Sequence, residues 1–215
     1  MNQPTSLPDC RVRIDPAATG ASNMAADEAL LAAAVECGKT AIRWYQWSEP
    51  TISLGYFQDD ARISLPIHLR ELPVIKRITG GGAILHHHEL TYACAIPAAH
   101  PLAREPRKLY VAVHEQIAAV LGKFDITVKM RGESYHEKNA EFLCFARGDA
   151  FDLVYGDHKI AGSAQRRRKG AILQHGSLIL CRSKFAPQFP GLFDVAGREI
   201  AISTLINALT EGVSL

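Results

Sequence analysis

The chain has 215 residues, enough for one large domain or two small ones, and 47% of them are hydrophobic, which supplies a substantial core. Its formal net charge of +2 does not indicate a nucleic-acid-binding protein, because binding to phosphates needs a concentrated basic surface. No window approaches the roughly 18 apolar residues of a membrane span, and the N-terminus does not resemble a signal peptide. We therefore expect a soluble, cytoplasmic protein without membrane or nucleic-acid partners, in which residues 1–215 form a single domain.

The first predicted helix covers residues 24–37. Ser22 or Asn23 is expected to cap it, because both residue types accept hydrogen bonds from the free amides of a helix start. Asp27 and Glu28 then fall in its first turn, where the helix dipole favours acidic side chains.

A second helix is predicted over residues 107–121, where apolar residues recur at helical spacing, and a terminal helix over 199–209. Alternating, β-branched and aromatic runs predict the strands between them. The pattern indicates an α+β fold, with a mixed or antiparallel sheet and covering helices. The expected strands are 10–15, 41–47, 51–56, 73–79, 83–86, 90–96, 126–130, 151–155, 159–164 and 171–181.

Three consecutive glycines, Gly80 to Gly82, follow the positively charged Arg77. They allow two interpretations. One is a tight turn that needs positive φ, and the other is a wall against which a ligand chain lies, with backbone amides and Arg77 binding its oxygen atoms. No Gly-Lys-Ser/Thr sequence follows, so this is not a phosphate-binding P-loop.

Three histidines and an acid follow in His86 to Glu89. Adjacent residues of a strand point to opposite faces and rarely share one ion, so we predict no metal site. We expect His86, on the same strand as the glycines, to line a pocket.

The five cysteines are odd in number and widely spread, which fits neither a disulfide framework nor CxxC metal spacing. Cys144 is of chemical interest because Lys159 follows it after one expected hairpin arm. A nearby cation stabilises a thiolate, which is the nucleophilic form of cysteine. The other four, which we interpret as reduced structural thiols, are Cys10, Cys37, Cys94 and Cys181.

Four motifs in the right order resemble the lipoate-protein ligase and octanoyltransferase family, which is related in fold to the biotin-protein ligases. The resemblance covers roughly residues 12–182 and implies a biotin/lipoate protein ligase-like catalytic domain. The motifs are ASNMAADEALL, RWYQWSEPTISLGYFQ, KRITGGGAILHHHELTY and KIAGSAQRRRKGAILQHGSLIL.

The resemblance also implies site residues. In that family the lysine of the Lys-x-x-Gly-Ser-Ala motif contacts the acyl carbonyl or acyl-adenylate, which implies Lys159. Two positions depart from the family pattern: Lys76 replaces a usual arginine, and His87 replaces a frequent aspartate. The residues implied to form the acyl pocket are Arg77, Thr79, Gly80, Gly81, Gly82, His86, Gly162, Ser163, Ala164, Gln165, His175 and Gly176.

Cys144 separates the two activities of the family. Its position fifteen residues before Lys159, in a Cys-Phe context, resembles the nucleophile of the lipoate-ligase-like octanoyltransferases. The resemblance then implies transfer of an octanoyl group from acyl carrier protein, through a Cys144 thioester, to a lysine of a lipoyl domain or glycine-cleavage H protein. It implies no cofactor, because the donor carries its own phosphopantetheine, and no C-terminal accessory domain.

Three alternatives remain open. The first is an ATP-dependent lipoate-protein ligase module that needs a separate accessory subunit. The others are a lipoyl-domain amidotransferase and a non-catalytic protein that binds acyl groups or lipoyl domains. The basic run Arg166, Arg167 and Arg168 is either a solvated face or a docking site for acidic carrier proteins and lipoyl domains, and Arg166 could instead face the pocket.

Overall fold

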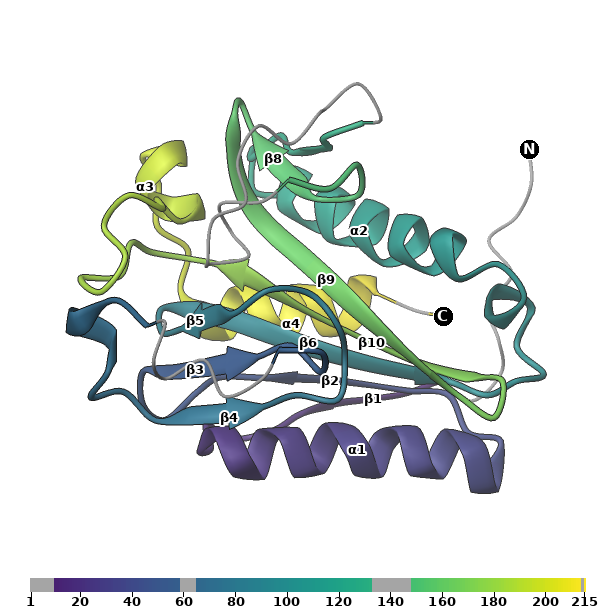
Figure 1. Ribbon diagram of the computed structural model, residues 1–215. Coiled ribbons are helices and arrows are strands. Elements are labelled where there is room, and N and C mark those ends of the chain that lie inside the picture. The colour runs from purple at the N-terminus through teal and green to yellow at the C-terminus, as the bar shows by residue number, and fades with distance from the viewer. Residues whose placement is uncertain (1–9, 59–64, 133–147, 214) are drawn as a thin grey trace.

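The computed structural model describes residues 10–58, 65–132, 148–213 and 215. Two sheets lie together with helices on either side (Figure 1). The helices are α1 (Gly20–Cys37), α2 (Pro106–Gly122), α3 (Leu192–Ala196), α4 (Ile202–Gly212) and the short 3₁₀ helices η2 (Ile67–Leu69) and η3 (Pro101–Ala103). The strands are β1 (Arg11–Ile14), β2 (Ala41–Tyr45), β3 (Thr51–Leu54), β4 (Val74–Lys76), β5 (Ile84–His86), β6 (Glu89–Ile96), β7 (Lys129–Met130), β8 (Leu153–Tyr155), β9 (His158–Arg168) and β10 (Ala171–Ile179).

The larger sheet has seven strands in the order β1-β2-β6-β10-β9-β8-β7. Only β1 and β2 pair in parallel in it; its other neighbours are antiparallel. The smaller sheet has the order β4-β3-β5, with one parallel and one antiparallel pair. Both sheets are therefore mixed, which confirms the predicted α+β class.

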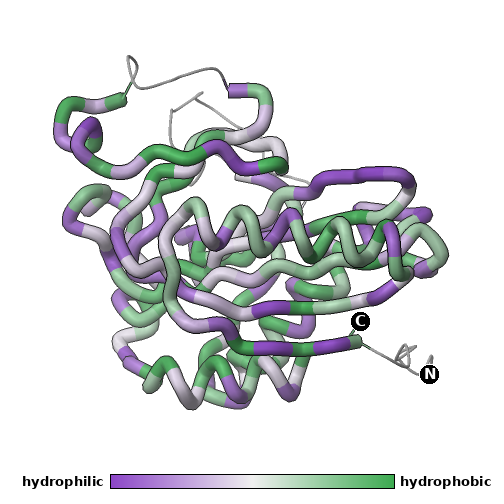
Figure 2. The backbone as a smooth tube through the Cα atoms, turned by 90° about the horizontal axis from the view of Figure 1, so that it is seen from below, coloured by the Kyte–Doolittle hydropathy of each residue, from purple (hydrophilic) through white to green (hydrophobic). Residues whose placement is uncertain are grey.

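Two apolar layers hold the helices on the large sheet. α1 packs on one face, where Leu31 and Ala34 meet Tyr45 and Leu173. α2 and α4 cover the other face, and Figure 1 shows α1 and α2 on opposite sides. Apolar and polar segments alternate along most of the chain (Figure 2), so the core draws on every element. In the described parts, no helix combines the length and the apolar character needed to cross a bilayer.

The predicted start of the first helix was wrong, whereas its predicted end at residue 37 is confirmed. α1 begins at Gly20, and its cap is Thr19, whose hydroxyl oxygen accepts a hydrogen bond from the amide of Ser22. Because the helix begins four residues earlier than predicted, its first turn contains no acidic residue and Asp27 lies in the second turn. A small residue is required at Gly20, since a Cβ there would lie 2.9 Å from the side chain of Thr51.

Other elements differ in length or were not predicted. The strand predicted over 126–130 is reduced to β7, and β9 runs four residues beyond its predicted end. The runs 41–47 and 51–56 are strands as predicted, but they belong to different sheets. α3 and the two 3₁₀ helices are too short to show a helical period in the sequence.

A buried ion pair fastens α1 to the large sheet. The Arg43 guanidinium of β2 lies 2.7 Å from a carboxylate oxygen of Asp27, and the two side chains are 2% and 1% exposed. Asn23 and Asp15 accept the remaining hydrogen bonds of this guanidinium. A charge at this depth is tolerated only because it is paired and hydrogen-bonded.

Replacing Asp27 should therefore destabilise the protein strongly. We expect Asp27→Ala to lower the free energy of unfolding by about 3 kcal/mol, because it leaves a buried guanidinium without its main counter-charge. Urea unfolding followed by circular dichroism measures this loss. The control is Glu28→Ala, at an exposed neighbouring position of the same helix, which should change stability by less than about 0.5 kcal/mol. Equal losses in the two variants would contradict the role given to the pair.

Candidate active site

A cavity of about 300 Å³ lies where the two sheets meet α1 and α2. Its walls are more apolar than polar. The side chains come from distant parts of the sequence: Met24 of α1, Trp47 after β2, and Tyr110 and His114 of α2. Ten of the predicted site residues line it: Arg77, Gly81, Gly82, His86, Lys159, Gly162, Ser163, Ala164, His175 and Gly176.

The other predicted residues lie elsewhere. Thr79 is one hydrogen bond behind the wall, on His175, whereas Gln165 donates to Gln174, which does not line the cavity. Gly80 is next to the wall, and its carbonyl oxygen accepts from Arg77. Cys144, the proposed nucleophile, lies outside the described residues.

The glycine segment forms a wall of main chain. The Arg77 guanidinium donates to the carbonyl oxygens of Gly80 and Gly82, each at 2.7 Å. Gly81 has φ of 92°, a conformation that favours glycine. A Cβ at Gly55 would lie 2.0 Å from the Gly81 carbonyl oxygen, so the two main chains touch. Arg77 therefore shapes the wall through protein contacts, and the positive φ of Gly81 agrees with the first interpretation of the glycines; that a ligand chain lies against them stays a prediction.

His86 is fixed on three sides. Its Nδ1 lies 2.6 Å from a carboxylate oxygen of Glu89, its Nε2 lies 2.7 Å from the Ser53 hydroxyl, and its ring stacks on Trp47 at 3.7 Å. Burial raises the pKa of Glu89, but the charge of His86 and hydrogen bonds from His86, Thr91 and Ser177 outweigh it and hold that pKa below its usual value.

His175 is held in a similar way on the other side of the glycines. Its Nε2 lies 2.5 Å from the Thr79 hydroxyl and its Nδ1 lies 3.1 Å from a carboxylate oxygen of Asp27. Burial lowers the pKa of His175, although Asp27 opposes the shift. The histidine thus connects the cavity wall to the ion pair with Arg43.

Lys159, one of the two predicted catalytic residues, places a cationic group in the cavity wall. Its ammonium lies 2.9 Å from Asp152, and the two side chains are 8% and 4% exposed. Burial raises the pKa of Asp152, and the charge of Lys159 acts against that shift. Gly162 makes room for the pair, because a Cβ there would lie 2.8 Å from Lys159 Cε and 3.0 Å from Asp152 Oδ1.

A chain of hydrogen bonds that was not predicted crosses the far wall. His114 Nε2 lies 2.6 Å from the Ser163 hydroxyl, which lies 2.7 Å from the Tyr92 hydroxyl. The other ring nitrogen donates to the Phe151 carbonyl oxygen. Burial lowers the pKa of His114 to about 4, against the effect of this hydrogen bond, so the ring is neutral near pH 7. One sequence signal was available: His114 lies on the apolar face of the predicted helix, next to Val113.

This hydrogen-bond network leaves no space for a side chain at Gly176. A Cβ at this position would lie 2.3 Å from the Ser163 hydroxyl and 2.7 Å from the Tyr92 ring.

The histidines after His86 do not add a metal site, because His87 turns to Ser183 and stacks on His88. Across residues 10–58, 65–132, 148–213 and 215, no three His, Cys, Asp or Glu side chains converge as metal ligands.

The three arginines after the lysine motif differ in their surroundings. Arg166 is half-buried and lies over the Tyr56 ring, 4.2 Å from its centre. Arg167 donates to the Ala103 carbonyl oxygen just before α2. Arg168 is exposed and pairs loosely with Glu28 at 3.5 Å. None of the three lines the cavity.

The sequence from residue 19 to residue 189 matches the family described as the lipoyl protein ligase A/B catalytic domain. The chain belongs to this family. Among its relatives, octanoyltransferase LipM of Moorella thermoacetica is 39% identical over 166 residues, which cover 74% of this chain and 60% of the relative. Octanoyltransferase LipM of Carboxydothermus hydrogenoformans is 30% identical over 222 residues, covering 91% and 82%.

The fold agrees with membership of the lipoyl protein ligase family. The structure of a bi-partite lipoate protein ligase with its E2 lipoyl domain, from Thermoplasma acidophilum, superposes with a TM-score of 0.69 over 95% of this chain and 82% of that chain, at 19% identity. This shows the same fold. The chain spans about 60% of the length of the Moorella relative.

The neutral state of His114 predicts a specific pH dependence of stability. Its pKa is about 4 in the folded protein and about 6.5 in an unfolded chain, so the unfolded state takes up the proton first as the pH falls. The stability that the neutral ring contributes is complete above pH 6.5 and is lost toward pH 4. We expect this group to remove about 2 kcal/mol between pH 7 and pH 5.

Urea unfolding at the two pH values measures the effect. His114→Gln should make the loss of stability between pH 7 and pH 5 smaller by about 2 kcal/mol than in the parent protein. His158→Gln, at an exposed position of β9, should leave it unchanged. The same pH dependence in the parent and in His114→Gln would show that His114 is not the buried neutral group.

Proposed function

We propose that the protein is an octanoyltransferase that moves an octanoyl group from acyl carrier protein, through a thioester on Cys144, to a lysine of a lipoyl domain or glycine-cleavage H protein. Relatives named octanoyltransferase LipM, at 39% and 30% identity, support this assignment. The geometric observation that carries it is the buried Lys159 ammonium at the wall of a largely apolar cavity. An apolar cavity suits an acyl chain, and a nearby cation suits a thiolate nucleophile.

The first step forms the acyl-enzyme. The Cys144 thiolate, stabilised by the charge of Lys159, attacks the thioester carbonyl carbon of the donor. A new carbon–sulfur bond to Cys144 forms and the bond to the phosphopantetheine sulfur breaks. The leaving thiolate takes up a proton from the Lys159 ammonium, which becomes a neutral amine. Main-chain amides near the reacting carbonyl are proposed to stabilise the negative charge on its oxygen.

The second step transfers the acyl group to the acceptor. The ε-amine of the acceptor lysine attacks the Cys144 thioester, an amide forms, and Cys144 leaves as a thiolate. Lys159, left neutral by the first step, takes up or relays the proton that the amine loses, which restores its charge beside the Cys144 thiolate. Passage from a thioester to a second thioester and then to an amide is downhill, so the proposal needs neither ATP nor a metal. The expectation of a cytoplasmic enzyme stays a prediction.

The contacts of Lys159 and His175 fit these steps. Asp152 fixes the direction of the ammonium, and Gly162 leaves the space that this direction needs. His86 and His175 are held by buried carboxylates, which keeps their rings from moving into the acyl chain. The binding energy of the acyl chain can therefore orient its carbonyl end rather than reorganise the wall.

An ATP-dependent ligase is the main alternative, because the fold is also that of a lipoate protein ligase. That activity would form an acyl-adenylate and would not need Cys144. An amidotransferase would use the same thioester but a different donor, and a non-catalytic binding protein would form no thioester.

Intact-mass analysis distinguishes these activities. After mixing with octanoyl-carrier protein, we expect one octanoyl group on the parent protein and on Cys37→Ser, a control at an exposed cysteine, and none on Cys144→Ser. Lys159→Ala should form the adduct about 10² to 10⁴ times more slowly, because the thiolate loses its counter-charge. Octanoyl-H protein and octanoate with ATP are offered as competing donors.

Absence of the adduct on the parent protein, or an adduct that persists in Cys144→Ser, would reject the role of Cys144. Faster acylation from octanoyl-H protein than from carrier protein would indicate the amidotransferase. Product formation only with octanoate and ATP would indicate the ligase.

A further inference from the structure

One end of this protein carries a concentration of exposed cations. Residues 98–108 and 165–170 contain seven of the 24 lysines and arginines but one of the 22 acids, a net charge of +6. The whole chain has a formal net charge of +2, so the remaining residues sum to −4. We name the exposed members the cationic end: Arg104, Arg107, Lys108, Arg167, Arg168 and Lys169.

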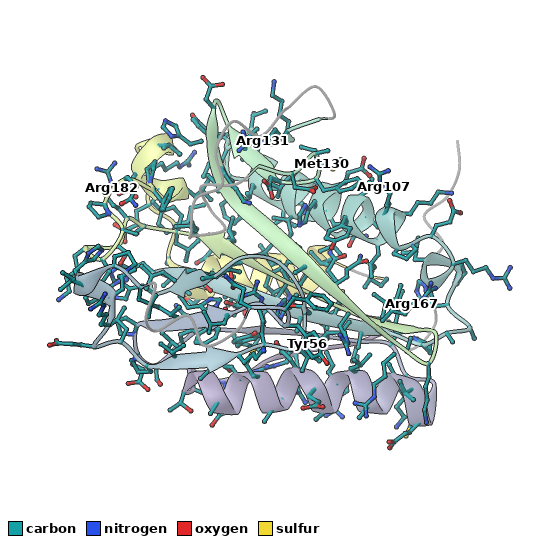
Figure 3. All side chains as sticks on the ribbon, viewed as in Figure 1. Tyr56, Arg107, Met130, Arg131, Arg167 and Arg182 are labelled. Carbon is teal, nitrogen blue, oxygen red and sulfur yellow. The ribbon has the colours of Figure 1, made fainter. Side chains whose placement is uncertain are left out.

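Contacts between the two segments make the cationic end one surface. The Arg167 guanidinium donates to the Ala103 carbonyl oxygen, and the Gln165 amide donates to the Pro106 carbonyl oxygen at 2.8 Å. These bonds hold the tip of the β9–β10 hairpin against the start of α2. Figure 3 shows Arg107 and Arg167 at the same end of the molecule and Arg182 at the opposite end. The sequence offered only the basic run Arg166 to Arg168 as a docking site; its joining to the start of α2 was not predicted, because about sixty residues separate the two segments.

The cationic end adjoins the cavity. The Arg107 guanidinium lies over the ring of Phe151, 5.2 Å from its centre, and Phe151 lines the cavity. Tyr110, also in the wall, stacks on the same ring. A partner bound to the cationic end would therefore sit next to the cavity.

The position of these cations opposes helix stability. The N-terminus of a helix carries partial positive charge, which favours acids and disfavours cations in the first turn. α2 has Arg107 and Lys108 there and no acid. Glu105, just before the helix, lies 2.8 Å from Lys108, and both side chains are more than half exposed. A local arrangement that opposes stability is expected where function requires it.

We infer that the cationic end is the docking surface for the acidic carrier domain of the acyl donor. This inference rests on the proposed octanoyltransferase function. Carrier domains are acidic, and a concentrated surface of opposite charge speeds and orients their binding. The arginines of the cationic end indicate the acyl donor, rather than the acceptor, as the protein that binds there. The arm of the donor contains a phosphodiester, which a guanidinium binds through paired hydrogen bonds, and Arg107 stands beside the cavity.

Charge reversal away from the cavity tests the inference. In Arg104→Glu/Lys108→Glu we expect the KM for octanoyl-carrier protein to rise at least tenfold, with weaker salt dependence, and the kcat to stay within a factor of two. The KM for octanoyl-pantetheine, a donor without carrier domain or phosphate, should not change. The melting temperature should stay the same or rise, because acids now occupy the positive end of α2. A melting temperature below that of the parent protein would instead indicate a structural defect in the variant.

The matched control is Arg182→Glu/Lys184→Glu, which makes the same change of charge at the opposite end and should leave every constant unaltered. Fluorescence anisotropy with labelled carrier protein measures binding independently of catalysis.

An unchanged KM in the cationic-end variant, or an equal rise with octanoyl-pantetheine, would overturn the inference. A rise only in the KM for the lipoyl domain would assign the surface to the acceptor instead. No acyl-enzyme on the parent protein would reject the proposed function itself, whereas an acylated parent with unchanged carrier binding in the variant rejects only the docking surface.

Discussion

The cavity of this protein depends on the compensation of buried charge. Arg43 and Arg77 are both 1% exposed, and each is surrounded by acceptors: carboxylates for Arg43, and carbonyl oxygens of the glycine segment for Arg77. Asp27 and Glu89 are buried equally well and are satisfied by histidines and hydroxyls. Ions so placed direct their hydrogen bonds away from the cavity, which leaves an apolar space between them. An apolar ligand can occupy that space without displacing the partners of these four ions.

The elements of the fold were largely predictable because their periods are local properties. The helix over Pro106–Gly122 and the central strands Glu89–Ile96 and Ala171–Ile179 follow apolar patterns that the sequence displays directly. The motif residues were also predictable as a group, since ten of them line one cavity. The capping residue of the first helix was less predictable. Thr19 and Ser22 are equally suited to begin a helix, and tertiary contacts at Gly20 decide between them.

The partners of the site residues were not predictable. Asp152 and Lys159 come together across a short hairpin, but His114 reaches Ser163 over 49 residues, and His175 reaches Asp27 over 148. Such pairs follow from sheet order and strand register, which single-sequence patterns do not fix. The cationic end has the same origin, since a helix start and a hairpin tip become neighbours only in the folded chain.

The main-chain wall formed by Gly55 and the glycine segment limits which substitutions can reshape the cavity. Its shape is set by peptide groups, and the space beside Gly55 is already filled by the Gly81 carbonyl oxygen. Substitution there removes the wall rather than adjusting it. Side chains elsewhere in the cavity wall, among them Met24, Trp47 and Ile84, are not under this main-chain constraint, so their substitution can change the shape of the cavity. The cavity thus combines a part whose shape is fixed by main chain with a part whose shape is set by side chains.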